Sequence, residues 1–439
     1  GAAAVGAVLA SAFAAFPPLL LSWGTLYPTG LAYMGIPFGL AVLVALLDAR
    51  MRAGVLMPLT IAAAGWFVAE VFSHPRSLPI VAVIALPLLA VAAGRLVARA
   101  WAVPRRRKLV VGVLSASVLA LVAVGVAGWV YVWRTYDVAN RPISDHLNGG
   151  PATAKQTIPE AVAQALTLSP AHAFEMLPAV LLAAAVLFGA VVAVRSGRGW
   201  LAVAWVLVVV LFALASGSNS DLAKLATGIW YKDQFRLFAL LPIVGVPLAT
   251  GAVMEVARRI GGRFGTRAAL PAAAVATALL AATSWASPAS AGVRADIGAV
   301  FATPPAGAPA MIDAEEYAFL TGIAEYVPEG EIVAGNPWNG SALVWALGGR
   351  EALFPHFTGE WSADEFLVAA ALDRAGDDPE VCAAVDRLGL HYVLTDLSLL
   401  WGDPAEAALY SGIDRAAGSG VLSEVARSGD TALSRITAC

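Results

Sequence analysis

The sequence predicts an α-helical polytopic membrane protein of about nine spans with a C-terminal extracytoplasmic α/β domain. Of its 439 residues, 59% are hydrophobic and 13% are charged, whereas an ordinary soluble domain carries about 25% charged residues. The shortage of charge ends near residue 290, after which charged residues return to a soluble density. We therefore divide the chain into a transmembrane domain, residues 1–290, and an extracytoplasmic α/β domain, residues 291–439.

Nine apolar runs account for the predicted spans, since a helix needs about 20 apolar residues to cross the hydrocarbon layer. The first run is short, and no charged segment or cleavage site of a signal peptide precedes it. We therefore expect the chain to be truncated at its N-terminus, with further residues ahead of Gly1. The runs are 1–16, 30–47, 54–72, 78–98, 109–133, 173–194, 199–216, 236–257 and 267–288.

Arginine and lysine gather in every second loop between these runs, and basic loops stay in the cytoplasm. The other loops and the tail after the ninth run then lie outside. The sequence thus predicts a multi-pass plasma-membrane protein whose C-terminal domain is extracytoplasmic. The basic residues are Arg50 and Arg52, Arg99 and Arg105 to Lys108, Arg195 and Arg198, and Arg258, Arg259, Arg263 and Arg267.

The tail replaces long apolar runs with alternating helices and strands, which predicts a small α/β domain. Helices are expected after the N-cap residue Asp313, over 341–347, and from Asp378 to the closing Gly389. Strands are expected at 331–334, 352–354 and 391–395, with a terminal hairpin at 421–426 and 432–436.

The chain has two cysteines, Cys382 and Cys439, and both lie in this tail. An extracytoplasmic location permits disulfides, so we predict one bridge between them, with two reduced buried thiols as the alternative. Two cysteines are too few for a metal site, and no Cys/His spacing indicates one.

The densest polar cluster beside a span is the outer stretch 228–236. Arg236 lies at the outer mouth of the eighth run, where its guanidinium can hold a phosphate with two parallel hydrogen bonds. Lys232 lies one turn before it if the helix begins there, and Tyr231 and Asp233 accompany them. The alternative is interfacial anchoring, because Trp, Tyr and Arg are ordinary at a membrane boundary.

A second outer turn, 73–76, holds His74 and Arg76, which can line the same polar cavity; a solvated hairpin explains them equally well. Weaker candidates are an aromatic loop at 22–28, a polar tail rim suited to sugars, and loop charges that include possible general bases. Aromatic belts, turn chemistry and solvation are their ordinary explanations. These candidates comprise Arg134, Asp137, Arg141, Asp145, His146, Asn219, Asp221, Lys224, 336–340 and 355–357.

Several function classes lack their motifs. The sequence has no phosphate-binding glycine loop with lysine, no paired metalloprotease histidines and no serine elbow, which argues against ATP-driven transport and proteolysis. Charges are nearly absent from the spans, which weakens ion-coupled transport. No basic patch is interleaved with aromatic residues, so no nucleic acid is expected as a partner.

Three motifs resemble a known class. The stretch Trp230 to Arg236 reads W-Y-x-D-x-x-R, Asn336 to Gly340 reads N-P-W-x-G, and Gly389 to Leu394 reads G-x-x-Y-V-L. With many spans, aromatic outer loops and an outer α/β domain, the chain resembles the GT-C class of membrane glycosyltransferases. Within that class it is similar to a group of uncharacterised actinobacterial membrane proteins.

The resemblance implies transfer of a sugar from a polyprenyl-phosphate carrier to a glycan acceptor during cell-envelope assembly. By this analogy Arg236 with Lys232 holds the lipid phosphate, and Asp233 orients it or the acceptor. The implied partners are membrane lipid, a polyprenyl-phosphate-linked sugar, the glycan acceptor and possible envelope-assembly proteins. No cofactor is expected, although the resemblance leaves dependence on a divalent metal open.

The catalytic base of such enzymes is typically a carboxylate of the first outer loop. Here no carboxylate precedes Asp48, which lies on the inner side. The base lies upstream of Gly1, or a later carboxylate has its role, or the protein is not a transferase. Two alternatives therefore stand beside the transferase: a non-catalytic scaffold whose outer domain binds glycan or a partner protein, and a transporter of lipid-linked precursors.

Overall fold

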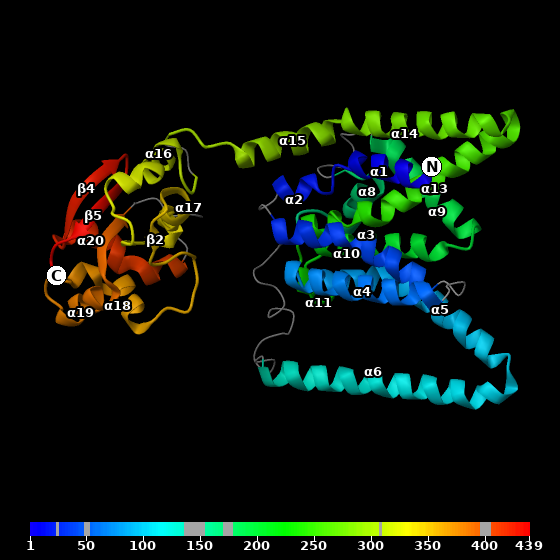
Figure 1. Cartoon of the computed structure of the whole chain (residues 1–439), viewed down its shortest axis with the longest axis horizontal. Coiled ribbons are helices and arrows are strands. Elements are labelled where there is room, and N and C mark those ends of the chain that lie inside the picture. Colours follow the sequence, from blue (N-terminus) through cyan, green and yellow to red (C-terminus); the bar gives the residue numbers. More distant parts are fainter. Residues whose placement is uncertain (23–25, 48–52, 136–153, 170–178, 307–309, 396–404) are drawn as a thin grey trace. The chain divides into compact units, whose positions relative to one another are not determined.

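The computed structural model describes the chain except for residues 23–25, 48–52, 136–153, 170–178, 307–309 and 396–404. The chain divides into two compact units, residues 1–300 and 301–439 (Figure 1). The predicted boundary at residue 290 falls inside helix α15 (Pro288–Phe301), at whose end the two units divide.

The first unit is helical throughout its described elements (Figure 1). Among the described residues, six helical stretches are long and apolar enough to cross a membrane: 27–47, 54–73, 77–101, 199–217, 234–264 and 266–285. The three other predicted runs coincide with α1, α6 and α9, of which α1 and α9 are shorter. The helices are α1 (Ala2–Ala12), α2 (Pro18–Ser22), α3 (Tyr27–Leu47), α4 (Ala53–Ser73), α5 (Ser77–Trp101), α6 (Arg107–Thr135), α8 (Ile158–Thr167), α9 (Ala179–Arg195), α10 (Gly199–Gly217), α11 (Asp221–Thr227), α12 (Gln234–Phe238), α13 (Leu241–Phe264) and α14 (Ala269–Trp285).

Helix α13 is the most buried of the long helices and packs against α9, α14, α1 and α10. Its contact with α9 is backbone to backbone, because a Cβ on Gly189 would meet the carbonyl group of Leu248. The short α12 precedes it, and residues 237–241, from the end of α12 to the start of α13, are buried. Helix α10 packs against α12, α5 and α8. These contacts hold the start of α12 near the α4–α5 hairpin.

The second unit contains a five-stranded sheet in the order β2-β1-β3-β5-β4. Strands β1, β2 and β3 are parallel, whereas β5 runs antiparallel to β3 and β4. Val333 of β1 pairs with Ala352 of β2 and Tyr392 of β3. This confirms the predicted α/β tail. The strands are β1 (Ile332–Gly335), β2 (Glu351–Ala352), β3 (Leu390–Thr395), β4 (Leu422–Ser428) and β5 (Thr431–Ile436).

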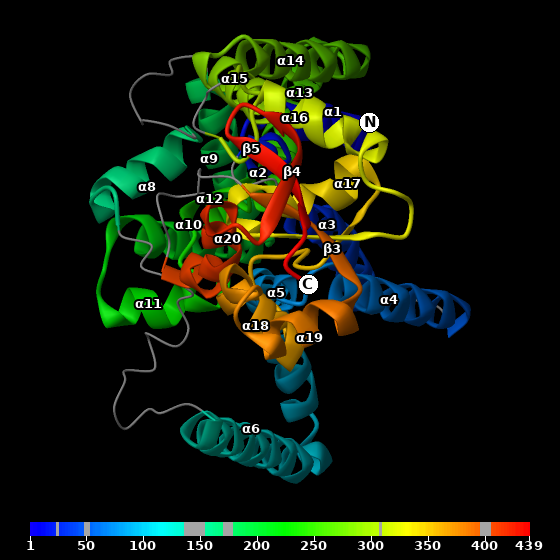
Figure 2. The ribbon, with the colours of Figure 1, turned by 90° about the vertical axis from the view of Figure 1, so that its left-hand side faces the viewer.

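Helices cover both faces of this sheet, as Figure 2 shows. Side chains alternate between the faces of a strand. Ala334 and Val393 therefore join the core under α18 (Ala363–Ala371), α19 (Pro379–Leu388) and α20 (Ser411–Ser419). Val333 and Leu394 join the opposite core, under α16 (Ala314–Gly322) and α17 (Val344–Gly348).

The helix ends of the tail follow the sequence signals. Asp313 caps α16 in a box with Glu316, and Asp378 caps α19, which Gly389 closes at φ 60°. Helices α18 and α20 were not predicted. For α18 a signal was present, because Ser362 and Glu365 form a capping box at its start.

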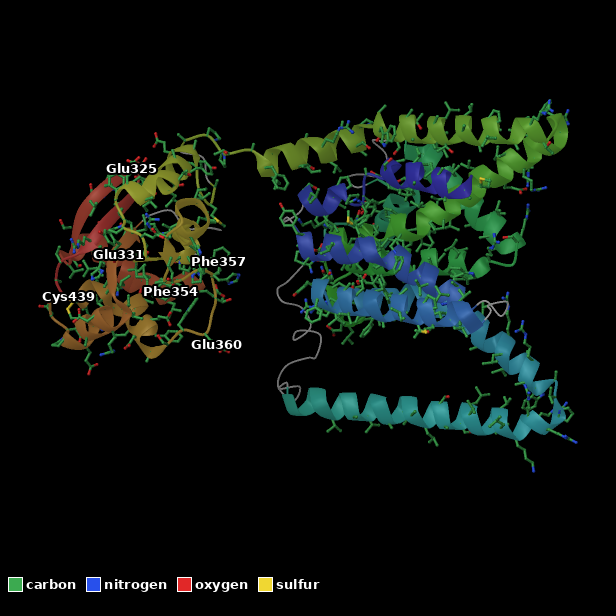
Figure 3. All side chains as sticks on the ribbon, viewed as in Figure 1. Glu325, Glu331, Phe354, Phe357, Glu360 and Cys439 are labelled. Carbon is green, nitrogen blue, oxygen red and sulfur yellow. A yellow bond between two sulfur atoms is a disulfide. The ribbon has the colours of Figure 1, made fainter. Side chains whose placement is uncertain are left out.

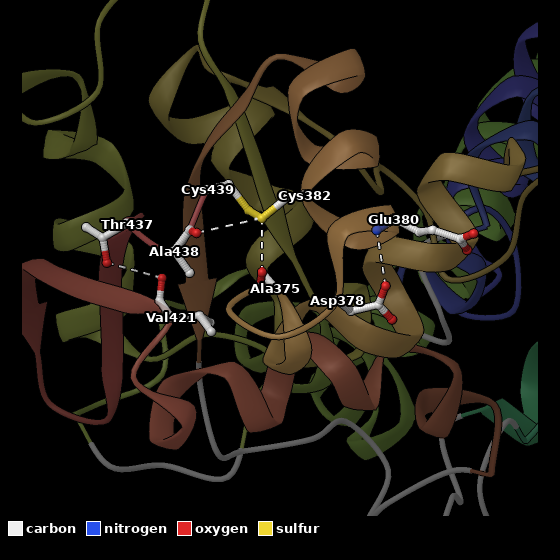
Figure 4. The surroundings of a disulfide bond; sticks show 8 residues. All are labelled: Ala375, Asp378, Glu380, Cys382, Val421, Thr437, Ala438 and Cys439. Atoms are coloured by element: carbon white, nitrogen blue, oxygen red, sulfur yellow. Dashed lines mark hydrogen bonds between the residues drawn. A yellow bond between two sulfur atoms is a disulfide. The ribbon is translucent and has the colours of Figure 1, made fainter.

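The predicted disulfide between Cys382 and Cys439 is present, with the two Cα atoms 5.3 Å apart (Figure 4). It joins α19 to the end of the chain. Beside it, the Thr437 amide donates a hydrogen bond of 3.0 Å to the Val421 carbonyl, so the terminal segment is also held to the start of the β4–β5 hairpin.

Candidate functional site

Three predicted residues form a stack where the α4–α5 hairpin meets the segment before α12. The Arg76 guanidinium carbon lies 3.7 Å from the centre of the Tyr231 ring, and that of Arg236 lies 4.7 Å from it. The Trp230 indole donates a hydrogen bond of 2.9 Å to the Arg76 carbonyl and ties the two segments together. We call Arg76, Tyr231 and Arg236 the arginine–tyrosine cluster.

The backbone before α12 places these side chains. Tyr231 and Lys232 are consecutive left-handed residues, with φ of 60° and 53°, a conformation that costs roughly 1–2 kcal/mol for each non-glycine residue. Amide hydrogen bonds from Tyr231 to Gly228 (2.8 Å) and from Lys232 to Thr227 (3.0 Å) hold the turn. As a result the Tyr231 side chain remains 37% exposed, while Lys232 is buried.

Asp233 is the N-cap of α12. Its Oδ1 accepts hydrogen bonds from the amides of Phe235 (2.8 Å) and Arg236 (3.3 Å), and its Oδ2 lies 3.0 Å from Arg236 Nε in an ion pair. The Arg236 N–H is not directed at this oxygen, so the pair lacks a hydrogen bond there. Asp233 therefore fixes the position of the Arg236 guanidinium.

Lys232 points away from the arginine–tyrosine cluster. Its ammonium donates hydrogen bonds to the Ala215 carbonyl (2.8 Å) and to Asn219 Oδ1 (3.3 Å) at the end of α10. Burial, and then the charge of Lys224, lower the pKa of Lys232. The ammonium thus holds the loop to α10, and the two guanidinium groups supply the positive charge of the cluster.

The two arginines share the Tyr231 ring and are near enough for the charge of one to act on the other. Burial, and then the charge of Arg236, lower the pKa of Arg76. Nη1 of Arg76 is buried and has no hydrogen-bond partner among the described residues. A buried donor without a partner costs free energy, and two adjacent cations repel. An anion with several oxygens between them would relieve both penalties.

Glu70 is a site residue that the sequence analysis missed. It is buried at the end of α4, where Oε2 accepts a hydrogen bond of 2.5 Å from Ser77 and Oε1 one of 3.1 Å from Trp66. A Cβ on Gly35 would collide with Oε1 of Glu70, so glycine is required for α3 to approach this closely. The sequence does contain a signal for Glu70, because a single carboxylate in an otherwise apolar span is a functional candidate.

His74 lies between Glu70 and Arg76, half-buried in the turn that joins α4 and α5. Its imidazole makes no hydrogen bond with any described residue, although its backbone bonds to Glu70 and Ser77. Burial, and then the charges of Arg236 and Arg76, lower the pKa of His74. The imidazole is therefore neutral near pH 7.

Some of the other predicted candidates lie outside the described residues. They are Asp137, Arg141, Asp145, His146 and residues 23–25 of the aromatic loop. No group of three His, Cys, Asp or Glu residues in the described segments is arranged to hold a metal.

In the second unit the Trp338 and Phe357 rings stack at 4.5 Å, and Asn336 donates a hydrogen bond of 2.9 Å to Asp414. Phe354 and Phe357 both lie in the segment that follows β2 (Figure 3). Trp338 is buried, so this stack belongs mainly to the core of the unit.

Comparisons with known proteins give a family without an assigned activity. No curated protein matches the chain significantly. The family model described as a family of unknown function (DUF6541) matches residues 1–438. Because this match spans nearly the whole chain, the protein belongs to that family of unknown function.

Proposed function

We propose that this protein is a membrane glycosyltransferase that takes a sugar from a polyprenyl-phosphate carrier and passes it to a glycan acceptor of the cell envelope. In this proposal the chain crosses the plasma membrane about nine times, and the arginine–tyrosine cluster and the C-terminal domain lie outside. The lipid phosphate contacts the two guanidinium groups at the edge of the Tyr231 ring.

The observation that carries the proposal is the pair of guanidinium groups on one tyrosine ring, with Arg76 Nη1 buried and unpartnered among the described residues. Guanidinium groups bind phosphate through two parallel hydrogen bonds. The cluster lies where the stretch Ser73–Ser77 joins two helices that are long and apolar enough to cross a membrane, and the proposal puts this stretch at the level of the lipid head groups. The W-Y-x-D-x-x-R stretch resembles the GT-C class of glycosyltransferases, and this resemblance supports sugar transfer at the proposed phosphate site.

Two alternatives predict other behaviour. A transporter of lipid-linked precursors would use the same phosphate site without releasing free polyprenyl phosphate. A scaffold would use its outer domain, where exposed His356 beside the Trp338–Phe357 stack offers a surface to glycan.

The test uses the full chain in lipid nanodiscs with a panel of short-chain polyprenyl-phosphate sugars and envelope glycan fragments. We expect release of polyprenyl phosphate together with a lengthened glycan. Arg76→Gln should weaken binding of polyprenyl phosphate at least tenfold, because a charged hydrogen bond contributes about 1.5–3 kcal/mol. Arg195→Gln, which changes an exposed arginine at the end of α9, is the matched control.

The outcomes separate the three functions. Lipid-phosphate binding with sugar transfer supports the transferase. Binding followed by movement of the intact donor across the bilayer supports the transporter. Glycan binding that is unaffected by Arg76→Gln, with no lipid-phosphate binding, supports the scaffold and rejects the proposal.

A further inference from the structure

The acid–base groups around the arginine–tyrosine cluster are nearly all engaged. Asp233 caps α12 and pairs with Arg236. Both oxygens of Glu70 accept hydrogen bonds, and the Lys232 ammonium donates to α10. Tyr33, which is near the charges of Arg236 and Asp233, is fully buried. Among the described residues of the site, His74 is left as a titratable side chain that is half-buried and makes no hydrogen bond.

We propose that His74 is the residue that accepts the hydroxyl proton of the acceptor during sugar transfer. This inference rests on the proposed function and adds the base that the sequence analysis could not assign. His74 shares its turn with Arg76, whose guanidinium lies on the Tyr231 ring beside Arg236. In the proposed complex, His74 therefore lies next to the phosphate that is the leaving group of the reaction.

The step balances without a co-reactant. The acceptor oxygen forms a bond to the anomeric carbon as the bond from that carbon to the phosphate oxygen breaks. The electron pair stays on the phosphate oxygen, and the acceptor proton moves to a ring nitrogen of His74. The phosphodiester anion becomes a phosphate dianion, while neutral imidazole becomes imidazolium, so the total charge is unchanged.

The surrounding charges make this transfer favourable as the reaction proceeds. The groups that face His74 are Arg76 on the same turn, Arg236 from α12 and the hydrogen-bonded Glu70 one turn earlier. Before transfer, burial and then the charges of Arg236 and Arg76 lower the pKa of His74, so the imidazole is neutral and able to accept a proton. The second negative charge that forms on the leaving phosphate offsets them, which raises the pKa of the imidazole when it must hold the proton.

Glu70 is the rival base, and its contacts assign it a different task. Its hydrogen bond to Ser77 spans the turn that carries His74 and Arg76, and its carboxylate is buried. We therefore assign Glu70 as a positioning residue that holds the turn, and not as a group that meets the acceptor.

The first experiment needs no turnover. The full chain in nanodiscs, with histidine labelled in its ring, is titrated from pH 5 to 9 by NMR with no ligand, with a short-chain polyprenyl phosphate, and with its methyl phosphodiester. His74→Gln identifies the His74 signal, and His356→Gln is the control. We expect the dianion to raise the pKa of His74 by about one unit or more and the diester to raise it less. Calorimetry of the wild type in two buffers should show matching proton uptake.

The second experiment measures transfer. His74→Gln should keep the dissociation constant for polyprenyl phosphate within about twofold and lower the transfer rate at least 100-fold, the usual contribution of a general base. The wild-type rate should fall as the pH drops below the pKa of His74. The residual rate of His74→Gln should not show this fall at acidic pH.

The results distinguish the two proposals. Absence of lipid-phosphate binding rejects the site, the proposed function and the role of His74 together. Binding with no change in the titration of His74, or a His74→Gln variant that transfers at the wild-type rate, rejects the base and leaves the phosphate site intact. Proton uptake with no transfer from any donor rejects the transferase and with it the base.

Discussion

The side chains of Tyr231 and Lys232 diverge because both residues are left-handed. One presents its ring to two guanidinium groups, and the other sends its ammonium to the end of α10. Strained backbone of this kind persists where the surrounding contacts over-determine it, and it gathers at functional sites. The hydrogen bond from Trp230 to Arg76 supplies such a contact.

Arg236→Lys should weaken the binding of polyprenyl phosphate about tenfold to a hundredfold, although it preserves the charge. A lysine cannot reproduce the two parallel hydrogen bonds of a guanidinium, nor its packing on the Tyr231 ring. Binding of a fluorescent short-chain polyprenyl phosphate in nanodiscs measures the effect, with Arg195→Lys as the control. Wild-type affinity in Arg236→Lys would rule out a bidentate phosphate contact at this residue.

The sequence alone pointed to the residue types of the candidate site, but not to the directions in which their side chains extend. The W-Y-x-D-x-x-R stretch and the His74–Arg76 turn were recognisable as polar groups at span ends, and the structure brings Arg76, Tyr231 and Arg236 together. The position of Lys232 follows from its φ of 53°, which no local pattern of non-glycine residues predicts. The burial of Glu70 depends on Gly35 of another helix and could not be derived from α4 itself.

At the scale of elements, capping signals were the most reliable guide in the tail. Asp313, Asp378 and Gly389 mark the ends of their helices as expected, because each satisfies backbone groups that a helix end leaves unpaired. Helix α20 has no side-chain cap, which explains why the sequence analysis did not predict it. In the membrane unit, apolar runs located the helices to within a few residues where both are described, as in 54–72 and α4 (Ala53–Ser73).

Gly389→Ala should destabilise the junction of α19 and β3 by about 1–2 kcal/mol. No atom lies within 4 Å of a Cβ built there, so the loss would come from the left-handed backbone alone. Gly418→Ala is the matched control, since its Cβ is equally unobstructed and its φ is not positive. Hydrogen exchange of the β3 amides reports the opening free energy. Equal values in the two variants would contradict the strain argument.

On the scale of the whole molecule, the two compact units have separate cores and separate sources of stability. The first buries apolar helices around α13, and the second surrounds a sheet and closes with a disulfide. The change in composition near residue 290 lies inside α15 (Pro288–Phe301). It could not predict that α15 would continue to Phe301, because that helix is neither long nor strongly apolar.

Cys439→Ser should lower the stability of the second unit by about 4 kcal/mol, the entropic effect expected for a cross-link between residues 57 apart. Hydrogen exchange in α19 and β5 measures the loss. Reducing the wild type should reproduce it, and reducing Cys439→Ser should add nothing. A reduced wild type as stable as the oxidised one would show that the bridge contributes little.

The proposed orientation can be tested by labelling single cysteines in intact cells, because both natural cysteines are bonded. Glu329→Cys lies on an exposed position of the second unit, and Arg195→Cys on an exposed helix end. A membrane-impermeant maleimide should label Glu329→Cys directly and Arg195→Cys only after the membrane is opened. The reverse pattern would invert the topology and place the phosphate site inside the cell.

The hydrogen bond between Trp230 and Arg76 joins residues 154 positions apart, and this has a consequence for biogenesis. Chains are synthesised at about 5–20 residues per second, so the α4–α5 hairpin emerges roughly 8–30 s before its indole and tyrosine partners. During that interval the guanidinium of Arg76 has no ring to pack on, and the nascent hairpin must wait in the translocation machinery or at the lipid surface. The arginine–tyrosine cluster can therefore assemble only after the ribosome has passed residue 236.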